Sequence, residues 1–285
     1  MVNAPPDAEL VRRYLRGEVD VTRPRDAATV VLLRDGDRGL ETYLLRRQAA
    51  MAFGAGMHVF PGGSVDVRDG DASIGWVGAA PSAWARTLHC DDRLAGALVC
   101  AAVRETFEES GVLLAADVDG TMVGDTAGDD WETDRLALID GSTSLGEFLT
   151  RRSLVLRADL LRGWAHWITP EWSRRRYDTR FFVAAVPAGQ RTRDVRGEAD
   201  HVFWLPVAEA LTRHRAGDLT AMAATTATLE ELSRYRTVAD ALAAERSIRP
   251  IMRRALLVDG EVRLFHDTVS AAPPGAGSVQ PPPAG

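Results

Sequence analysis

Three glutamates stand at positions i, i+3 and i+4 in the run Arg104-Glu105-Thr106-Phe107-Glu108-Glu109-Ser110-Gly111. On a helix, at about 100° per residue, Glu105, Glu108 and Glu109 share one face. They repel one another, and the last two precede Gly111 in the final turn, where the helix dipole disfavours negative charge. A hard divalent cation, Mg²⁺ or Mn²⁺, resolves this conflict because it prefers carboxylate oxygens and brings phosphate substrates with it. The run therefore predicts a metal site, with a solvated acidic helix end as the alternative.

A Gly-Gly sequence, Phe60-Pro61-Gly62-Gly63, precedes this helix. Together the two segments resemble the Nudix hydrolase box, G-x5-E-x7-R-E-U-x-E-E-x-G-U, where U is a bulky aliphatic residue. The positions that fit are Gly63, Arg104-Glu105, Glu108-Glu109, Gly111 and Val112. The resemblance implies an α/β/α sandwich with a mixed sheet, and an enzyme that hydrolyses diphosphates linked to a nucleoside.

The box departs from the family pattern between its two halves. After five intervening residues, Gly63 is followed by Asp69 where the pattern has glutamate. Asp69 and Arg104 are 35 positions apart instead of eight, so about 27 residues are inserted. Asp69 is expected to join the three glutamates as a metal ligand, with Asp66 and Asp71 as alternatives.

Hydrolysis of a diphosphate requires charge neutralisation, a positioned water and often a general base. The family resemblance gives Arg104 an orienting role, paired with Glu105 or another carboxylate. Gly62-Gly63 would let the backbone approach the diphosphate without side-chain obstruction, with a simple tight turn as the alternative. The base would come from the box, where Glu105 and Glu109 are predicted to be catalytic, or from a later loop. Glu198 is the loop candidate, and an ordinary surface acid is the alternative for it.

Substrate recognition is expected to come from outside the box. Residues 44–63 look like the Nudix branch that includes the peroxisomal coenzyme A diphosphatases. That branch carries the signature L-L-T-x-R-[ST]-x3-R-x3-G-x3-F-P-G-G, with which Arg47 and Gly56 align. Ala52 stands where the signature has its second arginine, so one expected cationic contact is missing.

An arginine run offers a replacement for that contact. Arg174-Arg175-Arg176 lies between Trp172 and Tyr177. Guanidinium groups suit a 3′-phosphate, and aromatic rings can stack on adenine. The alternative is a solvated charge run beside core aromatics. The residues predicted to bind substrate are Arg47, Gly62, Gly63, Arg174 and Arg176.

The leading hypothesis is a metal-dependent diphosphatase of coenzyme A or acyl-coenzyme A, which releases adenosine 3′,5′-bisphosphate and a 4′-phosphopantetheine product. A Nudix hydrolase of ADP-ribose, NADH or dinucleoside polyphosphates is the alternative within the enzyme class. A catalytically impaired Nudix-fold protein that binds nucleotides or has a regulatory role is the alternative outside it. A small-molecule nucleotide is the expected partner, and a homodimer stays open.

Composition limits the remaining classes of function and the expected location of the protein. The 285 residues are 46% hydrophobic, enough for a sizeable core. The net charge of −6 argues against nucleic-acid and membrane binding, which rest on a positive field. All 34 basic residues are arginine, which excludes a P-loop lysine and a Schiff-base lysine. The N-terminus lacks a signal-peptide pattern, and no stretch is apolar enough to span a bilayer, so a cytoplasmic protein is expected.

The elements that must position these residues follow from periodicity and turn signals. Strands are predicted at 27–33, 41–45, 57–60, 112–116, 181–186, 201–205, 254–258 and 261–265. The first two are expected to form a hairpin, and the last two a closing hairpin. Helices are predicted at 6–17, over the box, at 145–151, after Pro206, and twice between 225 and 244. The predicted organisation is an N-terminal helical arm over 1–24, a Nudix domain over 25–270, and a disordered Pro/Gly-rich tail over 271–285. The insertion, 67–93, is expected to be a partly helical surface excursion.

Overall fold

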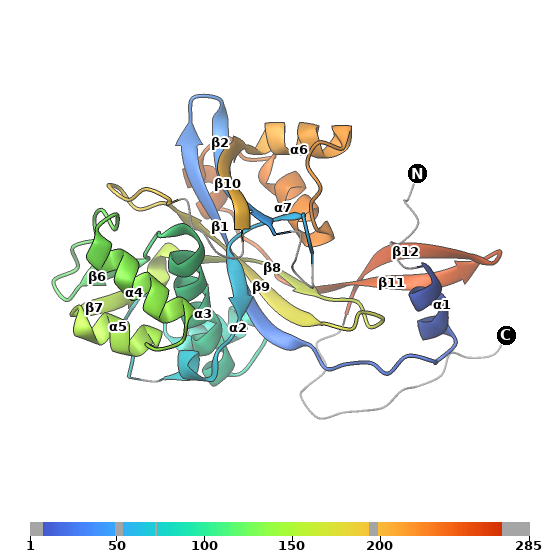
Figure 1. Ribbon diagram of the computed structural model, residues 1–285, viewed down its shortest axis with the longest axis horizontal. Coiled ribbons are helices and arrows are strands. Elements are labelled where there is room, and N and C mark those ends of the chain that lie inside the picture. The colour runs from blue at the N-terminus through green and yellow to red at the C-terminus, as the bar shows by residue number, and fades with distance from the viewer. Residues whose placement is uncertain (1–7, 49–53, 72, 194–198, 270–285) are drawn as a thin grey trace.

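A mixed sheet forms the centre of the fold in the computed structural model, which describes residues 8–48, 54–71, 73–193 and 199–269 (Figure 1). Its strands are β1 (Arg25–Gly36), β2 (Gly39–Arg47), β3 (His58–Val59), β4 (Gly62–Ser64), β8 (Arg162–Ile168), β9 (Tyr177–Ala185), β10 (Ala199–Pro206), β11 (Pro250–Val258) and β12 (Glu261–Thr268). The order is β10-β2-β1-β9-β8-β11-β12, with β3 paired to β2 and β4 paired to β1. The β1–β9 and β8–β11 pairs are parallel, and the other pairs are antiparallel.

β1 lies inside this sheet and is buried on both of its faces. Val30 and Leu32 contact one core, whereas Val31 and Leu33 contact the other. Such a continuous apolar run is typical of a strand that is covered on both sides. β1 turns into β2 with Gly36 opposite Gly39, which confirms the predicted hairpin.

Helices cover both faces of the sheet (Figure 1). The first core lies under α2 (Pro81–Leu88) and α3 (Asp92–Ser110). The second lies under α6 (Val207–Ala216), α7 (Ala223–Leu232) and α8 (Val238–Leu242). The predicted α/β/α sandwich is thereby confirmed. α1 (Ala8–Leu15) packs against the β11–β12 hairpin.

A second, smaller sheet extends the α3 side. It consists of β5 (Trp76–Val77), β7 (Leu154–Arg157) and β6 (Ala115–Asp117), in that order. The short elements around it are η1 (Val67–Gly70), α4 (Asp129–Ile139), α5 (Leu145–Arg151) and η2 (Ala158–Leu160). β5 and η1 come from the insertion, so the inserted residues build part of this layer.

The insertion differs from the expected surface excursion. Its helix α2 buries Trp84 and Leu88, which are i and i+4 on one helical face. The Trp84 ring stands edge-on to Phe182 of β9, with ring centroids 5.6 Å apart. The prediction of partial helicity is confirmed, but the helix belongs to the core because it packs against both α3 and β8.

Several predicted elements match closely, and others were missed. The predicted helix 145–151 is α5, and the predicted closing hairpin is β11–β12. The strand predicted at 112–116 begins later, at Ala115. α4, β7 and β8 were not predicted. Among the helices of the described ranges, none has the length and apolarity needed to cross a membrane.

Candidate active site

Helix α3 carries the acidic run at its C-terminal end. Asp91 caps its start by accepting from the Leu94 N–H at 2.8 Å. Gly111 ends it in the left-handed conformation, with φ +73°. Most residues of α3 are buried, so the helix is held on several sides and its acids project in fixed directions.

The Arg104 guanidinium is the centre of the acidic cluster. Its Nε and Nη2 donate to the two carboxylate oxygens of Asp69, both at 2.9 Å. Its Nη1 donates to Glu105 at 2.9 Å and to Glu108 at 3.2 Å. Nη2 also donates to the Ser64 carbonyl at 3.0 Å, which ties α3 to β4. Arg104 therefore has the orienting geometry that the family resemblance implied.

Asp69 faces Arg104 with both carboxylate oxygens. It is 2% exposed, and one of these oxygens also accepts from the Asp66 N–H at 2.8 Å. Asp66 and Asp71, the alternative metal ligands, both take part in local turns. Asp66 accepts from the Arg68 N–H, and Asp71 accepts from the Ser73 N–H. We therefore propose that Asp69 positions Arg104 and is not itself a metal ligand.

Asp69→Asn is expected to lower both stability and activity. The change leaves the buried guanidinium of Arg104 without its bidentate partner, and breaking such a pair costs about 3–5 kcal/mol. Thermal unfolding and turnover of a diphosphate substrate measure the two effects. Asp37→Asn, in the exposed β1–β2 turn, is the matched control and should change neither. An Asp69→Asn protein with wild-type melting temperature would contradict the positioning role.

Glu105 and Glu108 carry more negative charge than Arg104 compensates. Burial raises the pKa of Glu105 above its usual range against the lowering effect of Arg104, and the neighbouring Glu108 raises it further. Burial likewise raises the pKa of Glu108, against the same arginine. Three carboxylates, with Asp69, share one guanidinium. This cluster would be stabilised by an additional cation.

The residues fit a hard divalent cation in ligand type and in charge. Within the described ranges, however, no three acids, histidines or cysteines converge closely enough to enclose a metal ion. The carboxylates of Glu105 and Glu108 accept hydrogen bonds from Arg104, and that of Glu109 accepts from the Gly62 N–H at 2.8 Å. The predicted ligands are thus adjacent, with Glu105, Glu108 and Asp69 paired to Arg104 and Glu109 paired to the Gly62 N–H.

Gly62 and Gly63 form strand β4 and not the tight turn that was the alternative. They lie opposite Thr29 and Ala28 of β1. A Cβ on Gly62 would stand 2.4 Å from the Ala28 carbonyl oxygen, and one on Gly63 would stand 2.3 Å from Glu105 Oε1. Both positions therefore require glycine because neighbouring atoms occupy the space of a side chain.

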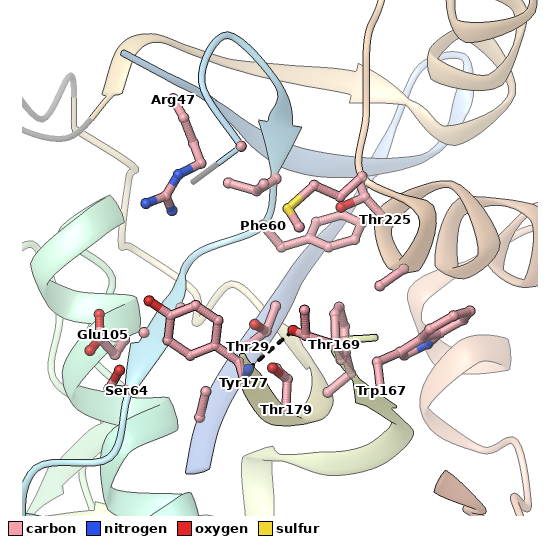
Figure 2. A pocket seen from close by; sticks show the side chains of 18 of the residues that line it. Thr29, Arg47, Phe60, Ser64, Glu105, Trp167, Thr169, Tyr177, Thr179 and Thr225 are labelled. Atoms are coloured by element: carbon pink, nitrogen blue, oxygen red, sulfur yellow. Dashed lines mark hydrogen bonds between the residues drawn. The ribbon is translucent and has the colours of Figure 1, made fainter. Parts of the chain in front are cut away.

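A cleft of about 1410 Å³ opens beside these residues (Figure 2). Its floor comes from β1, β8 and β9, and its acidic end from β4 and α3. The start of α7 and the β11–β12 hairpin complete the wall. Figure 2 shows Tyr177 between Glu105 and Trp167, with the Tyr177 N–H donating to the Thr169 hydroxyl at 3.0 Å.

The predicted substrate-binding residues divide into two groups. Arg47, Gly62 and Gly63 line the cleft. Arg176 does not, because it is buried and donates to the carbonyls of Thr169 and Thr22 at 3.1 and 2.6 Å. Arg174 is exposed and also lies outside the lining. The structure therefore places both arginines outside the cleft lining.

Arg175 lines the cleft instead. Side chains alternate between the two faces of a strand, and Tyr177, Thr179 and Phe181 of β9 all line the cleft. Arg175 lies two residues before Tyr177, in the bend that leads into β9.

Other parts of the lining were missed. They include residues 221–227 around the start of α7 and three residues of the final hairpin, Arg253, Leu264 and His266. They reach it through long-range pairing, such as β11 beside β8, for which no local pattern exists. Glu198, the predicted loop base, lies outside the described residues.

Comparisons with known proteins agree with this geometry. The family model described as NUDT19 Nudix domain matches residues 89–232. The acyl-coenzyme A diphosphatase NUDT19 of Gallus gallus is 26% identical over 246 residues, an alignment that covers 68% of this chain. The chain spans 64% of that relative's length. A solved NUDIX hydrolase from Alicyclobacillus acidocaldarius is 30% identical with a TM-score of 0.67, and the match covers 80% of this chain and 99% of that one.

Proposed function

The chain belongs to the NUDT19 Nudix domain family, and from this membership we propose that it is a metal-dependent diphosphatase of coenzyme A or acyl-coenzyme A. The observation that carries the proposal is the acidic cluster around Arg104 at the end of a large cleft, directly beside the Gly62-Gly63 strand. The products would be adenosine 3′,5′-bisphosphate and an (acyl-)4′-phosphopantetheine. Residues 25–270 are the proposed extent of the Nudix domain.

The proposed metal ligands are Glu105, Glu108 and Glu109, with Mg²⁺ or Mn²⁺ as the cofactor. When bound, the cation neutralises charge on the diphosphate and lowers the pKa of a bound water. Arg104 holds Glu105 and Glu108 in position, and the Gly62 N–H holds Glu109. The general base is proposed to be a box glutamate, Glu105 or Glu109, with Glu198 as the loop alternative.

The size and lining of the cleft support an extended substrate. Pockets for small ligands measure about 300–1,000 Å³, and this cleft exceeds that range. Arg47 and Arg175 supply positive charge, and Trp167 and Tyr177 supply aromatic surface. Phosphates and an adenine ring require such groups.

A substrate panel tests the proposal. Coenzyme A, acetyl-coenzyme A, ADP-ribose, NADH and a dinucleoside polyphosphate are incubated with Mg²⁺ or Mn²⁺, and the products are resolved by chromatography. Preferred cleavage of the coenzyme A compounds, abolished by a chelator, is expected. Preferred cleavage of another nucleotide would replace the substrate, and nucleotide binding without any turnover would indicate a binding protein.

Arg175→Ala is expected to raise the KM for coenzyme A about tenfold, because a charge-assisted hydrogen bond to phosphate contributes about 1.5–3 kcal/mol. Arg174→Ala is the matched control, since this neighbouring arginine is exposed outside the cleft. Steady-state kinetics measure both. Equal KM changes in the two variants would show that the cleft position of Arg175 has no role in binding.

A further inference from the structure

Helix α7 begins at the wall of the cleft with uncapped amide groups. Its N-cap is Met222, whose backbone is extended, with φ −68° and ψ 151°, and whose side chain makes no capping hydrogen bond. The first N–H groups of a helix have no partner inside the helix. In the described ranges, no backbone acceptor is found for the N–H groups of residues 223–225. These donors stand at the positive end of the helix dipole, and the residues that carry them line the cleft.

Thr225 provides a second, independent observation at the same place. It is only 3% exposed, yet it lines the cleft, and Figure 2 shows its hydroxyl turned toward that space. Among the described residues no hydrogen bond of this hydroxyl is found, and its oxygen is not one of the fully buried unpartnered side-chain atoms. The side chain is therefore packed while its hydroxyl reaches the cleft, where it is available to donate to a ligand.

The start of α7 lies next to strand β3, which precedes the glycine strand β4. The His58 N–H of β3 donates to the Thr220 carbonyl at 2.7 Å, and β3 leads directly into β4. A Cβ on Gly54 would lie 3.4 Å from both Arg47 Cδ and Met222 Sδ, which places the Arg47 side chain close to the N-cap. Glu230, about two turns from the start of α7, is the acid of this helix that lines the cleft.

We infer that the N-terminus of α7, with the Thr225 hydroxyl, binds a phosphate monoester of the substrate. Free N–H groups at a helix start and a hydroxyl donor suit a phosphate oxygen cluster. The inference rests on the proposed function, because coenzyme A carries one such group, the 3′-phosphate, besides its diphosphate. It also gives this phosphate a site after Arg174 and Arg176 are placed outside the cleft.

A comparison of two substrates measures the contribution of the 3′-phosphate to binding. Coenzyme A and dephospho-coenzyme A share the diphosphate bond and differ only in this group. The wild-type KM is expected to be about tenfold lower for coenzyme A. Thr225→Val, which keeps the side-chain shape, should raise the KM for coenzyme A several-fold, leave kcat nearly unchanged, and leave the KM for dephospho-coenzyme A unchanged.

Thr228→Val is the matched control. Thr228 is buried on the same helix at 1% exposure and its hydroxyl is also unpartnered in the described structure, but it does not line the cleft. This change should leave both KM values unaltered. Ala223→Pro is a second probe, because proline is favoured at the first helical position and removes only one N–H. The extended backbone of Met222 already suits a following proline.

Calorimetry with the products keeps this test separate from the test of the proposed function. Adenosine 3′,5′-bisphosphate should bind more tightly than AMP, and Thr225→Val or Ala223→Pro should remove most of that difference. Equal wild-type binding of the two nucleotides, or equal KM changes for both substrates, would overturn the phosphate site. Absence of turnover with a retained preference for the bisphosphate would overturn the proposed function and leave the site standing.

Discussion

Glu109→Gln is expected to lower the turnover of coenzyme A by about 100-fold to 1,000-fold without unfolding the protein. Glutamine retains an oxygen that can accept from the Gly62 N–H, so the local hydrogen bond survives. What is lost is one negative charge of the proposed metal site. Such a loss would remove on the order of 3–4 kcal/mol of transition-state stabilisation. The melting temperature without metal should stay the same or rise, because repulsion among the carboxylates is relieved.

The prediction requires kinetics, a metal titration and a melting curve. The metal concentration for half-maximal activity should rise together with the fall in turnover. Glu245→Gln, on the exposed segment after α8, serves as the control for removal of one acid and should behave as wild type. An active Glu109→Gln enzyme with normal metal dependence would exclude Glu109 from the metal site.

Alanine at Gly62 should destabilise the protein more strongly than alanine at Gly63, although both should lower activity. At Gly62 the new Cβ would meet backbone, 2.4 Å from the Ala28 carbonyl oxygen and 2.7 Å from Thr29 Cα. β4 would have to leave β1, which costs about 2–3 kcal/mol as in other overpacked sites. The melting temperature should therefore fall by about 5–10 °C. Activity should be lost with it, because the Gly62 N–H holds Glu109.

At Gly63 the new Cβ would meet the end of a side chain, the Glu105 carboxylate, at 2.3 Å. That side chain can rotate away, so the loss of stability should be smaller. Its movement would break the Arg104–Glu105 contact and displace a proposed metal ligand, so turnover should fall by at least about tenfold.

Gly124→Ala supplies the control for the glycine series. No atom lies within 4 Å of the position of its Cβ, and its φ is not positive. Melting curves and steady-state kinetics for the three variants should separate a folding defect at position 62 from a catalytic defect at position 63. Equal loss of stability at both positions would contradict this assignment.

The acidic helix and the glycine pair could be predicted because their signals are local. Helical periodicity places Glu105, Glu108 and Glu109 on one face, and the family pattern places Gly63 before them. The contact of Arg104 with Glu108 follows from its i, i+4 spacing. Its strongest contact, with Asp69, spans the insertion, so no local pattern could reveal it.

The missed elements share a physical reason. α4 begins with several acids and has no apolar stripe, so periodicity does not mark it as a helix. β8 joins the sheet by pairing with β9 and β11, and the second partner begins more than 80 residues later. Arg174 and Arg176 were predicted from residue type and the flanking aromatics, whereas the bend before β9, which no local pattern specifies, places Arg175 in the cleft lining.

The Asp69–Arg104 pair has a consequence for the order of folding. In the uninterrupted family pattern the corresponding positions are eight residues apart, so their contact closes a short loop. In this chain the contact closes a loop of 35 residues, and the entropic cost of closure grows with the logarithm of loop length. The loop contains α2, whose Trp84 and Leu88 belong to the core. We therefore expect the Asp69–Arg104 contact to depend on the docking of α2, so a substitution that loosens α2 should weaken the catalytic arrangement as well as the core.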